Sequence, residues 1–121
     1  MKRIIFNITP IGKPRMVRSD TWAERPAVLK YWAFKEELNI LVKQKRYSIG
    51  DDLNIVFRIP MLDSWSQKKK NKMAGEYHQQ KPDIDNLLKA FTDCLMTDDS
   101  KIYKVIVEKY WATTGSIEVF V

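Results

Sequence analysis

Hydrophobic and polar residues alternate in four segments of the chain, and this two-residue period is that of a β-strand with one buried face. In the first segment Ile4, Phe6 and Ile8 point to one side. The second stops at Pro60, which cannot donate a hydrogen bond within a sheet. Residues 113–115, Thr-Thr-Gly, predict a hairpin turn between the last two segments. The predicted strands are residues 2–9, 53–59, 102–111 and 116–121.

Two other segments repeat hydrophobic residues every three or four positions, as amphipathic helices do. The first predicted helix ends near Lys45 and Arg46, where basic side chains suit the negative end of the helix dipole. The second begins around Asp85, whose carboxylate can cap the free amides of the first turn. The predicted buried stripes are Ala27, Tyr31, Phe34, Leu38 and Leu41 in the first helix and Ile84, Leu88, Phe91 and Leu95 in the second.

A lysine-rich stretch lies between the second strand and the second long helix. It follows Ser64-Trp65-Ser66-Gln67, which has the residues of a capping box, and it ends at Gly75. This pattern predicts a short basic helix, with a mobile loop as the alternative. The length of 121 residues suits one compact domain. We therefore expect an α+β fold, a single domain over residues 1–121 with a mixed sheet of about four strands and two long helices.

The charge of the chain favours an anionic partner. The net charge is +6 at pH 7, and clustered Lys and Arg gain free energy by releasing counterions from a phosphate backbone. Basic residues dominate the first half, whereas acidic residues outnumber basic ones from Asp83 onward. A basic body around an acidic centre is typical of a metal-dependent nuclease, and ordinary surface charge for solubility is the alternative.

Cysteine usage and hydropathy indicate the compartment. The single cysteine, Cys94, excludes an intrachain disulfide framework and a cysteine-based zinc site. The apolar stretch after Arg3 is too short for the core of a signal peptide, and no run approaches the roughly 20 apolar residues of a membrane span. We expect a soluble, cytoplasmic protein without a membrane partner.

The candidate chemistry lies in residues 81–99. Pro82 disfavours a helical conformation of the residue before it, so the chain should enter the helix extended, with alternate residues pointing the same way. Asp83 and Asp85 are therefore expected to face one another. Asp98 and Asp99 follow after a helix of roughly ten residues, or about 15 Å, so they meet the first pair only if the chain folds back.

Paired carboxylates of this kind favour a divalent cation. They repel one another unless a cation lies between them, and Mg²⁺ commonly takes one or two carboxylates together with a substrate phosphate. If the chain folds back, Mg²⁺ would polarise a phosphodiester and activate water, while Lys89 would stabilise charge that develops on phosphate oxygens. No covalent nucleophile is required, and His78 has no evident Ser or Cys partner for a triad.

Each feature also has a purely structural interpretation. Asp83 and Asp85 are common helix-capping residues, and residues 98–100, Asp-Asp-Ser, are an ordinary turn composition. Lys89, with an acid four residues before and after it, fits a surface ion-pair ladder worth about 0.2–0.5 kcal/mol per pair. For His78 the structural interpretation is a surface or loop position.

The order of polar residues in residues 81–109 reduces this ambiguity. The pattern is Pro-Asp-x-Asp-Asn-x-x-Lys, then an Asp one turn after the Lys, then Asp-Asp before a strand. In this it resembles the RusA family of Holliday junction resolvases, over about a quarter of the chain. The matching residues are Pro82, Asp83, Asp85, Asn86, Lys89, Asp93, Asp98 and Asp99.

The resemblance implies a magnesium-dependent homodimer, of bacterial or phage origin, that resolves four-way DNA junctions by paired cuts during recombination and repair. It implies that Asp83, Asp85 and Asp99 are the catalytic, metal-binding carboxylates and that Lys89 is the essential basic residue. A homodimer suits the substrate because a four-way junction is nearly two-fold symmetric.

Basic residues outside the acidic segment are candidate DNA contacts, because phosphate contacts position a nucleic acid without reading its sequence. Lys13-Pro14-Arg15 is also similar to the basic lead-in of the family, whereas the lysines of residues 68–72 are assigned on charge alone. The candidates are Lys13, Arg15, Arg18, Lys68, Lys69, Lys70, Lys72 and Lys81.

Two alternatives stay open on sequence. A non-catalytic DNA-binding protein with the same basic surface would bind DNA without magnesium-dependent cleavage. A nuclease for flaps or other branched DNA would keep the metal chemistry and change the substrate. A panel of branched DNAs, tested with and without magnesium, separates the three.

Overall fold

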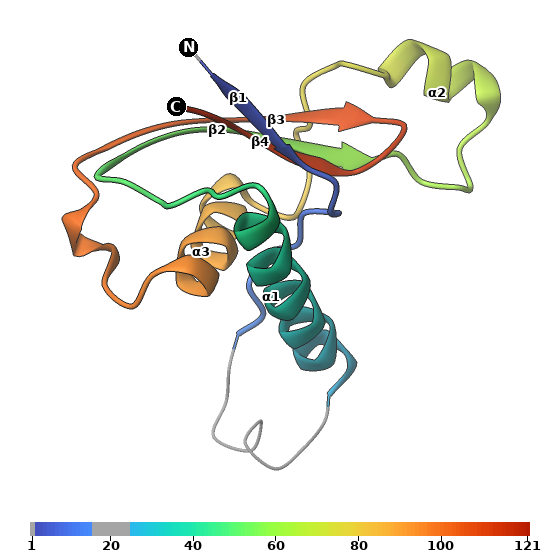
Figure 1. Cartoon of the computed structure of the whole chain (residues 1–121). Coiled ribbons are helices and arrows are strands. Elements are labelled where there is room, and N and C mark those ends of the chain that lie inside the picture. Colours follow the sequence, from blue (N-terminus) through green and yellow to red (C-terminus); the bar gives the residue numbers. More distant parts are fainter. Residues whose placement is uncertain (1, 16–24) are drawn as a thin grey trace.

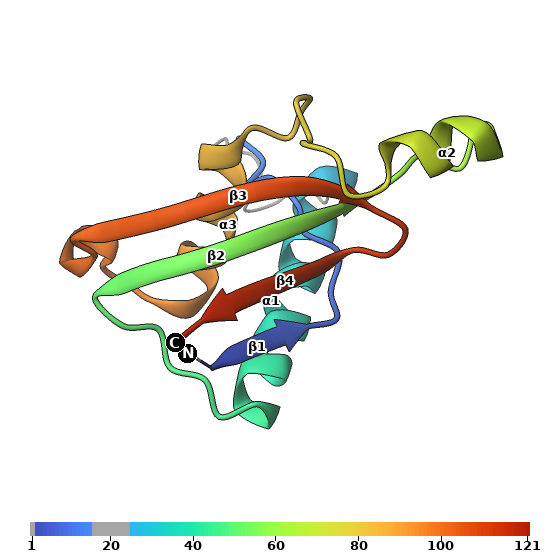
Figure 2. The same cartoon turned by 90° about the horizontal axis from the view of Figure 1, so that it is seen from above.

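The strands form one mixed sheet. The computed structural model describes residues 2–15 and 25–121, and in these residues four strands lie in the order β1-β4-β2-β3 (Figure 2). The central strand, β2 (Asp52–Pro60), pairs in parallel with β3 (Lys104–Ala112) and antiparallel with β4 (Ser116–Phe120). At the other edge, β1 (Arg3–Phe6) pairs antiparallel with β4. The predicted mixed sheet is confirmed.

The hairpin predicted between the last two strands is wrong. Residues 113–115 join β3 to β4, but β2 lies between these strands and pairs with both. The cause is the burial of β2, which is apolar on the side of Phe57 and carries buried Val56 on the other side. A strand buried on both faces takes a central place, whereas β3 is largely exposed and lies at the edge.

Two long helices cover one face of the sheet, and the core lies between them and the strands (Figure 1). They are α1 (Pro26–Gln44) and α3 (Ile84–Leu95). Parallel strands need a crossover connection, and α3 lies in the crossover from β2 to β3. The result is the expected small α+β domain. No helix among the described residues is long and apolar enough to cross a membrane.

The buried stripe of α1 differs from the prediction at its ends. Ala27 is exposed and Leu41 is only partly buried. The stripe instead runs from Val28 to Val42, which are separated by about four helical turns and so lie on one side of the helix. The buried residues are Val28, Tyr31, Phe34, Leu38 and Val42.

The stripe of α3 is also rotated relative to the prediction. Ile84 is 37% exposed and Leu88 only partly buried, because Leu87 takes the central buried position. The helix starts one residue earlier than predicted, with Asp83 rather than Asp85 at the N-cap. Its buried residues are Leu87, Ala90, Phe91, Thr92 and Cys94. The rotation turns the side of Leu88 toward the protein surface.

A short helix, α2 (Gln67–Met73), extends beyond one end of the sheet (Figure 1) and confirms the predicted basic helix. Its N-cap is Ser66 rather than Ser64, and the Ser66 hydroxyl accepts a 3.2 Å hydrogen bond from a backbone amide of the first turn. Just before the helix, the ring of Trp65 packs against Trp111 of β3, with centroids 4.7 Å apart. This contact attaches the helix to the core.

Candidate active site

Asp85 and Asp99 line the same surface pocket, and Lys89 lines it with them. Asp85 belongs to the first turn of α3, and Asp99 begins the short 3-10 helix η2 (Asp99–Lys101). Within the described part of the chain, neither carboxylate has a hydrogen-bond or ion-pair partner. The other lining residues are Leu88, Thr92, Ile102 and Val105. The pocket therefore holds one base beside two acids that have no partner among residues 2–15 and 25–121.

The fold supplies the chain reversal that this meeting requires. After α3, η2 turns the chain, and β3 runs back past the side of the helix that carries Asp85, Lys89 and Thr92. Those residues share one helical face because they are separated by three or four positions. The reversal is held by parallel pairing of β3 with β2 and by a 2.9 Å hydrogen bond from the Tyr103 amide to the Asp51 carbonyl.

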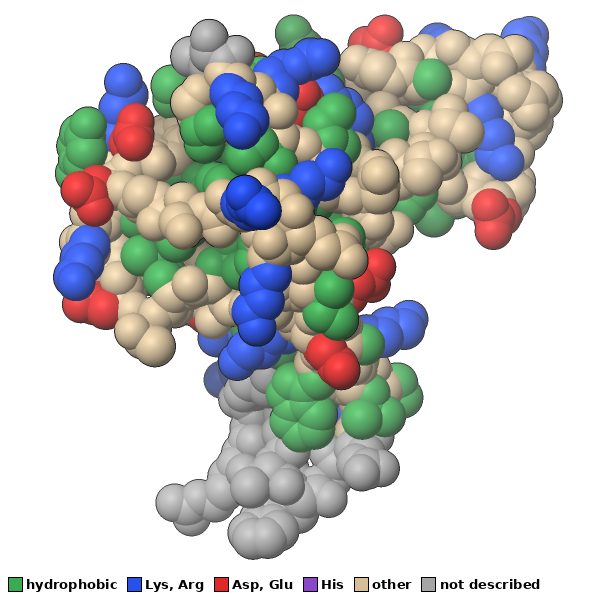
Figure 3. All heavy atoms as spheres, in the orientation of Figure 1, with side chains coloured by type: hydrophobic (Ala, Val, Ile, Leu, Met, Phe, Trp, Pro, Cys, Tyr) green, Lys and Arg blue, Asp and Glu red, His purple; other side chains and the backbone are tan. Residues whose placement is uncertain are grey.

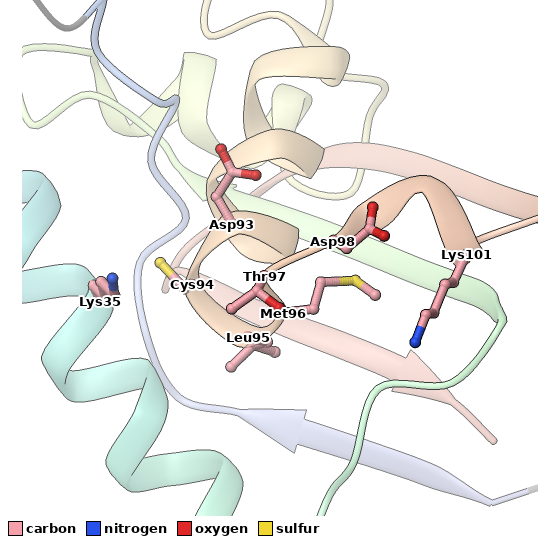
Figure 4. A pocket seen from close by; sticks show the side chains of 8 residues that line it. All are labelled: Lys35, Asp93, Cys94, Leu95, Met96, Thr97, Asp98 and Lys101. Carbon is pink, nitrogen blue, oxygen red and sulfur yellow. The ribbon is translucent and has the colours of Figure 1, made fainter.

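Asp98 and Asp99 have different surroundings. The Asp98 carboxylate caps η2, accepting hydrogen bonds from the Ser100 hydroxyl at 2.6 Å and the Ser100 amide at 3.0 Å. These bonds lower the pKa of Asp98 from its usual value. Its side chain lines another pocket at the end of α3, together with Lys101 from the same turn (Figure 4). Asp98 therefore has a structural function, whereas Asp99 is available for chemistry.

Asp83 lies outside this pocket. It is the N-cap residue of α3, yet its side chain makes no capping hydrogen bond, so capping does not account for it. Among the described residues, no three Asp, Glu, His or Cys side chains are grouped closely enough to hold a metal ion. Asp85 and Asp99 nevertheless fit Mg²⁺, because this ion is commonly bound by one or two carboxylates and completes its shell with water and phosphate oxygens.

Asp93 brings two lysines together beside the pocket. Its Oδ2 atom forms an ion pair with Lys13 and lies 3.8 Å from the Nζ atom of Lys89. The Lys13 side chain is 27% exposed and that of Lys89 is 56% exposed. The charge of Lys13 is therefore matched inside the protein, whereas Lys89 faces the pocket and the solvent.

The loop after β1 packs against the start of α3. The amide of Lys13 donates a 3.2 Å hydrogen bond to the carbonyl of Asn86. At Gly12, a Cβ atom would lie 3.0 Å from the Cβ atom of Pro82, so the missing side chain permits this close approach. The basic loop and the acidic segment, far apart in the sequence, are thus neighbours.

The other predicted DNA contacts lie at the surface. Arg15 and Lys81 are exposed near the loop and the start of α3, and Arg18 lies outside the described residues. The lysines of α2 are held away from the carboxylate pocket, on the helix that projects from the sheet (Figures 1 and 3). Of these, Lys68, Lys69 and Lys72 are exposed and Lys70 is partly buried.

Lys109 was not predicted as a site residue. Its ammonium donates hydrogen bonds to the carbonyls of Gln80, at 2.7 Å, and Pro82, at 2.8 Å. Burial lowers the pKa of Lys109. The sequence did contain a signal, because Lys109 alternates with Val107 and Trp111 on the inner face of an edge strand. A lysine among apolar residues on that face needs a partner inside the protein.

His78 lies in a loop, one of the two positions predicted for it, but it is buried rather than at the surface. It is 2% exposed, its ring lies 4.3 Å from that of Trp111, and neither ring nitrogen has a hydrogen-bond partner in the described structure. Burial lowers the pKa of His78, and the nearby charge of Lys109 adds to this effect. The histidine is therefore a buried residue packed against Trp111, in surroundings that disfavour its charged form.

Comparison with protein families identifies a match over nearly the whole chain. The family model described as endodeoxyribonuclease RusA matches residues 6–121, nearly the whole chain. No curated protein matches the chain. The match extends well beyond the acidic segment and takes in both long helices, the α2 helix and the three strands after β1.

Proposed function

The chain belongs to the RusA family of endodeoxyribonucleases, which are Holliday junction resolvases, and from this premise we propose that it is a magnesium-dependent enzyme that cuts four-way DNA junctions by paired, symmetric nicks. The observation that carries the proposal is the pocket that Asp85, Asp99 and Lys89 line together. When bound there, Mg²⁺ supplies Lewis-acid chemistry that polarises a phosphodiester and makes water more acidic.

We assign metal binding to the acidic residues of the site and stabilisation of the phosphate charge to its lysine. Asp85 and Asp99 supply oxygen ligands. The family resemblance assigns Asp83, two residues before Asp85, as a third carboxylate, although it lies outside the pocket in this structure. The ammonium of Lys89 balances the charge that develops on the phosphate oxygens as the bond to the leaving oxygen breaks. Asp93 keeps Lys89 beside the pocket, from one helical turn away.

The junction is held mainly through its phosphates. Arg15, Lys81 and the lysines of α2 are surface cations that gain free energy when they displace counterions from DNA. These contacts carry no base information, which suits an enzyme that recognises the shape of a branch rather than a sequence. Arg18 belongs to the same basic loop in the sequence and is assigned the same function.

The active form is a homodimer. Two nicks at symmetric positions need two active sites related by a two-fold axis, and a dimer provides this arrangement on a substrate of the same symmetry. Sedimentation equilibrium with and without a four-way junction tests this step. A monomer that cuts both strands in one binding event would contradict it.

The test of the function is cleavage of a labelled synthetic four-way junction beside a linear duplex of the same sequence. We expect paired symmetric nicks in the junction alone, in the presence of Mg²⁺ and not in EDTA. If the protein binds the junction but does not cut it with Mg²⁺ or Mn²⁺, the proposed nuclease activity is refuted and the protein is a non-catalytic DNA-binding protein. If the protein cuts flaps in preference to four-way junctions, it is a nuclease, but the proposal that four-way junctions are its substrate is refuted.

Matched variants test the carboxylates. Asp85→Asn should lower the cleavage rate on the order of 100-fold or more while junction binding in EDTA is kept or strengthened, because a charge that repels phosphate is removed. Asp63→Asn removes the same charge from an exposed position before α2 and should leave the rate unchanged. Equal rates for the two variants would remove Asp85 from the site.

A further inference from the structure

Lys109 links the edge strand to the segment that leads into the acidic helix. Its ammonium donates hydrogen bonds to the carbonyls of Gln80 and Pro82, at 2.7 and 2.8 Å. Pro82 immediately precedes Asp83, so one of these bonds lies next to the backbone of a proposed metal ligand. Within the described residues, no other side chain of the edge strand donates a hydrogen bond to this segment.

Asp83 depends on its backbone for its position. It is the N-cap residue of α3 but makes no capping hydrogen bond, and its side chain has no hydrogen-bond partner among the described residues. Lys109 donates a hydrogen bond to the carbonyl of Pro82, the residue bonded to Asp83, so its ammonium lies next to the backbone of Asp83.

The same strand connects Lys109 to Asp99. Only Ile102 and Tyr103 separate η2 from β3, and the pairing of β3 with β2 extends from Lys104 to Ala112, so the strand is held along its whole length. A side chain anchored on this strand fixes whatever it binds relative to the start of the strand. Through Lys109, the approach to Asp83 is fixed relative to the element that carries Asp99.

We propose that Lys109 is a positioning residue, which holds the backbone that leads into α3 so that Asp85, in the first turn of the helix, stays beside Asp99 to bind a divalent cation. The inference rests on the proposed function. Lys109 contacts neither DNA nor the reacting atoms in this arrangement. It acts through two carbonyl groups and the residue that follows them.

Lys109 could also act through its charge alone. The loss of its charge and the loss of its positioning would change the affinity for a metal ion in opposite directions. A positive charge near a carboxylate opposes the binding of a cation, so removal of the charge alone would strengthen metal binding. Loss of positioning would weaken it, because outer residues that orient metal ligands typically contribute about 10–100-fold in affinity. Metal affinity therefore discriminates between them without any measurement of cleavage.

The experiment compares Lys109→Met with Lys104→Met, which removes the same charge from an exposed position on the same strand. The probe is Mn²⁺, with the free ion measured by electron paramagnetic resonance. We expect Lys109→Met to bind Mn²⁺ about tenfold more weakly than Lys104→Met, and Lys109→Arg to restore most of the affinity. Hydrogen exchange of residues 83–87 should be faster in Lys109→Met alone.

Lys109→Gln provides a second, milder variant if Lys109→Met does not fold, since its shorter neutral side chain keeps a donor but cannot span both carbonyls. Unchanged or stronger Mn²⁺ binding in the Met or Gln variant would overturn the inference. The proposed function and the positioning role of Lys109 can be refuted independently of one another. A wild-type protein that binds Mn²⁺ but cuts no junction refutes the proposed function alone, and normal cutting with unaltered Mn²⁺ binding by Lys109→Met refutes this inference alone.

Discussion

Lys13 and Asp93 form an ion pair that joins the loop after β1 to the acidic helix α3. Their side chains are 27% and 23% exposed, so solvent and salt screen the pair less than a fully exposed one. The same Asp93 oxygen lies 3.8 Å from Lys89, which lines the carboxylate pocket. The basic loop and the pocket are thus connected through one carboxylate.

This connection predicts coupling between Lys13 and Asp93. Lys13→Met and Asp93→Asn should each lower kcat/KM for junction cleavage, and the double variant should be little worse than the more damaging single variant. A coupling free energy of about 1 kcal/mol is expected for residues in direct contact. Lys43→Met, an exposed change on α1, controls for the removal of one positive charge. Strictly additive effects would show that the two residues act independently.

The two neighbouring aspartates of the η2 turn should differ in function. Asp99→Asn is expected to lower the cleavage rate on the order of 100-fold or more, as removal of a charged group in the active site does. Asp98→Asn should change the rate little, because Asp98 only caps η2 through Ser100. Single-turnover cleavage at saturating protein measures both. Equal losses would contradict the assignment of Asp99 as the ligand.

The lysines of α2 should contribute to junction binding without any part in chemistry. Replacing Lys68, Lys69 and Lys70 together with Ala should weaken binding and flatten the dependence of log affinity on log salt, by about 0.9 for each phosphate that is no longer neutralised. The single-turnover rate at saturating protein should be unchanged. Replacing Lys30, Lys43 and Lys45, on α1 and at its C-cap, removes equal charge as a control. If both triple variants have the same slope, α2 makes no specific contribution.

Parts of the site could be predicted from the sequence where the information is local. Asp85 and Lys89 share a helical face by spacing alone, and the short basic helix has its own cap and stop residues. The meeting of Asp85 with Asp99 could only be predicted conditionally, because it depends on the pairing of β3 with β2, which are far apart in the sequence. Long-range pairing leaves no local signal.

The features that the sequence did not predict correctly also depend on contacts that leave no local signal. Residues 113–115 carry a true turn signal, but the turn does not choose the partner strand; the burial of β2 on both faces does. Asp98 and Asp99 are equivalent in the sequence and differ only through the hydrogen bonds to Ser100. The partners of Lys109 are two backbone carbonyls, which residues of any type would provide.

His78 should make stability depend on pH in a range where other side chains titrate little. Its pKa in the folded protein is below the usual value of about 6.5, which the unfolded chain keeps. The unfolded state therefore binds a proton more readily than the folded state. The free energy of unfolding is highest above about pH 6.5 and decreases as the pH drops toward the pKa of His78 in the folded protein. The decrease is at most about 1.4 kcal/mol per pH unit. Urea denaturation between pH 7.5 and 5.5 measures this.

His78→Phe is the comparison for this titration, since it keeps a ring against Trp111 and removes the ionisable group. Because His78 is the only histidine of the chain, the difference between the two proteins isolates its contribution. The variant should lose the slope between pH 6.5 and 5.5. A slope that persists in His78→Phe would assign the pH dependence to other groups.

Glu118 should contribute to stability and not to cleavage. It is 1% exposed on β4, with Oε1 at 2.9 Å from Arg58 Nη2 and Oε2 at 3.3 Å from Arg3 Nε. Its neighbours Ile117 and Val119 face the core, so Glu118 points to the other face of the sheet, away from α3 and the carboxylate pocket. Glu118→Gln leaves two guanidinium groups without their counter-charge.

The cost of this change should be modest because the guanidinium groups can turn to water. The Arg58 and Arg3 side chains are 36% and 65% exposed, so we expect a decrease of about 1–2 kcal/mol in the free energy of unfolding rather than the larger cost of breaking a fully buried pair. Urea denaturation measures the decrease, and single-turnover cleavage under Mg²⁺ should stay at the wild-type rate. A variant with unchanged stability but slower cleavage would place Glu118 in the catalytic machinery and contradict the separation of the two faces.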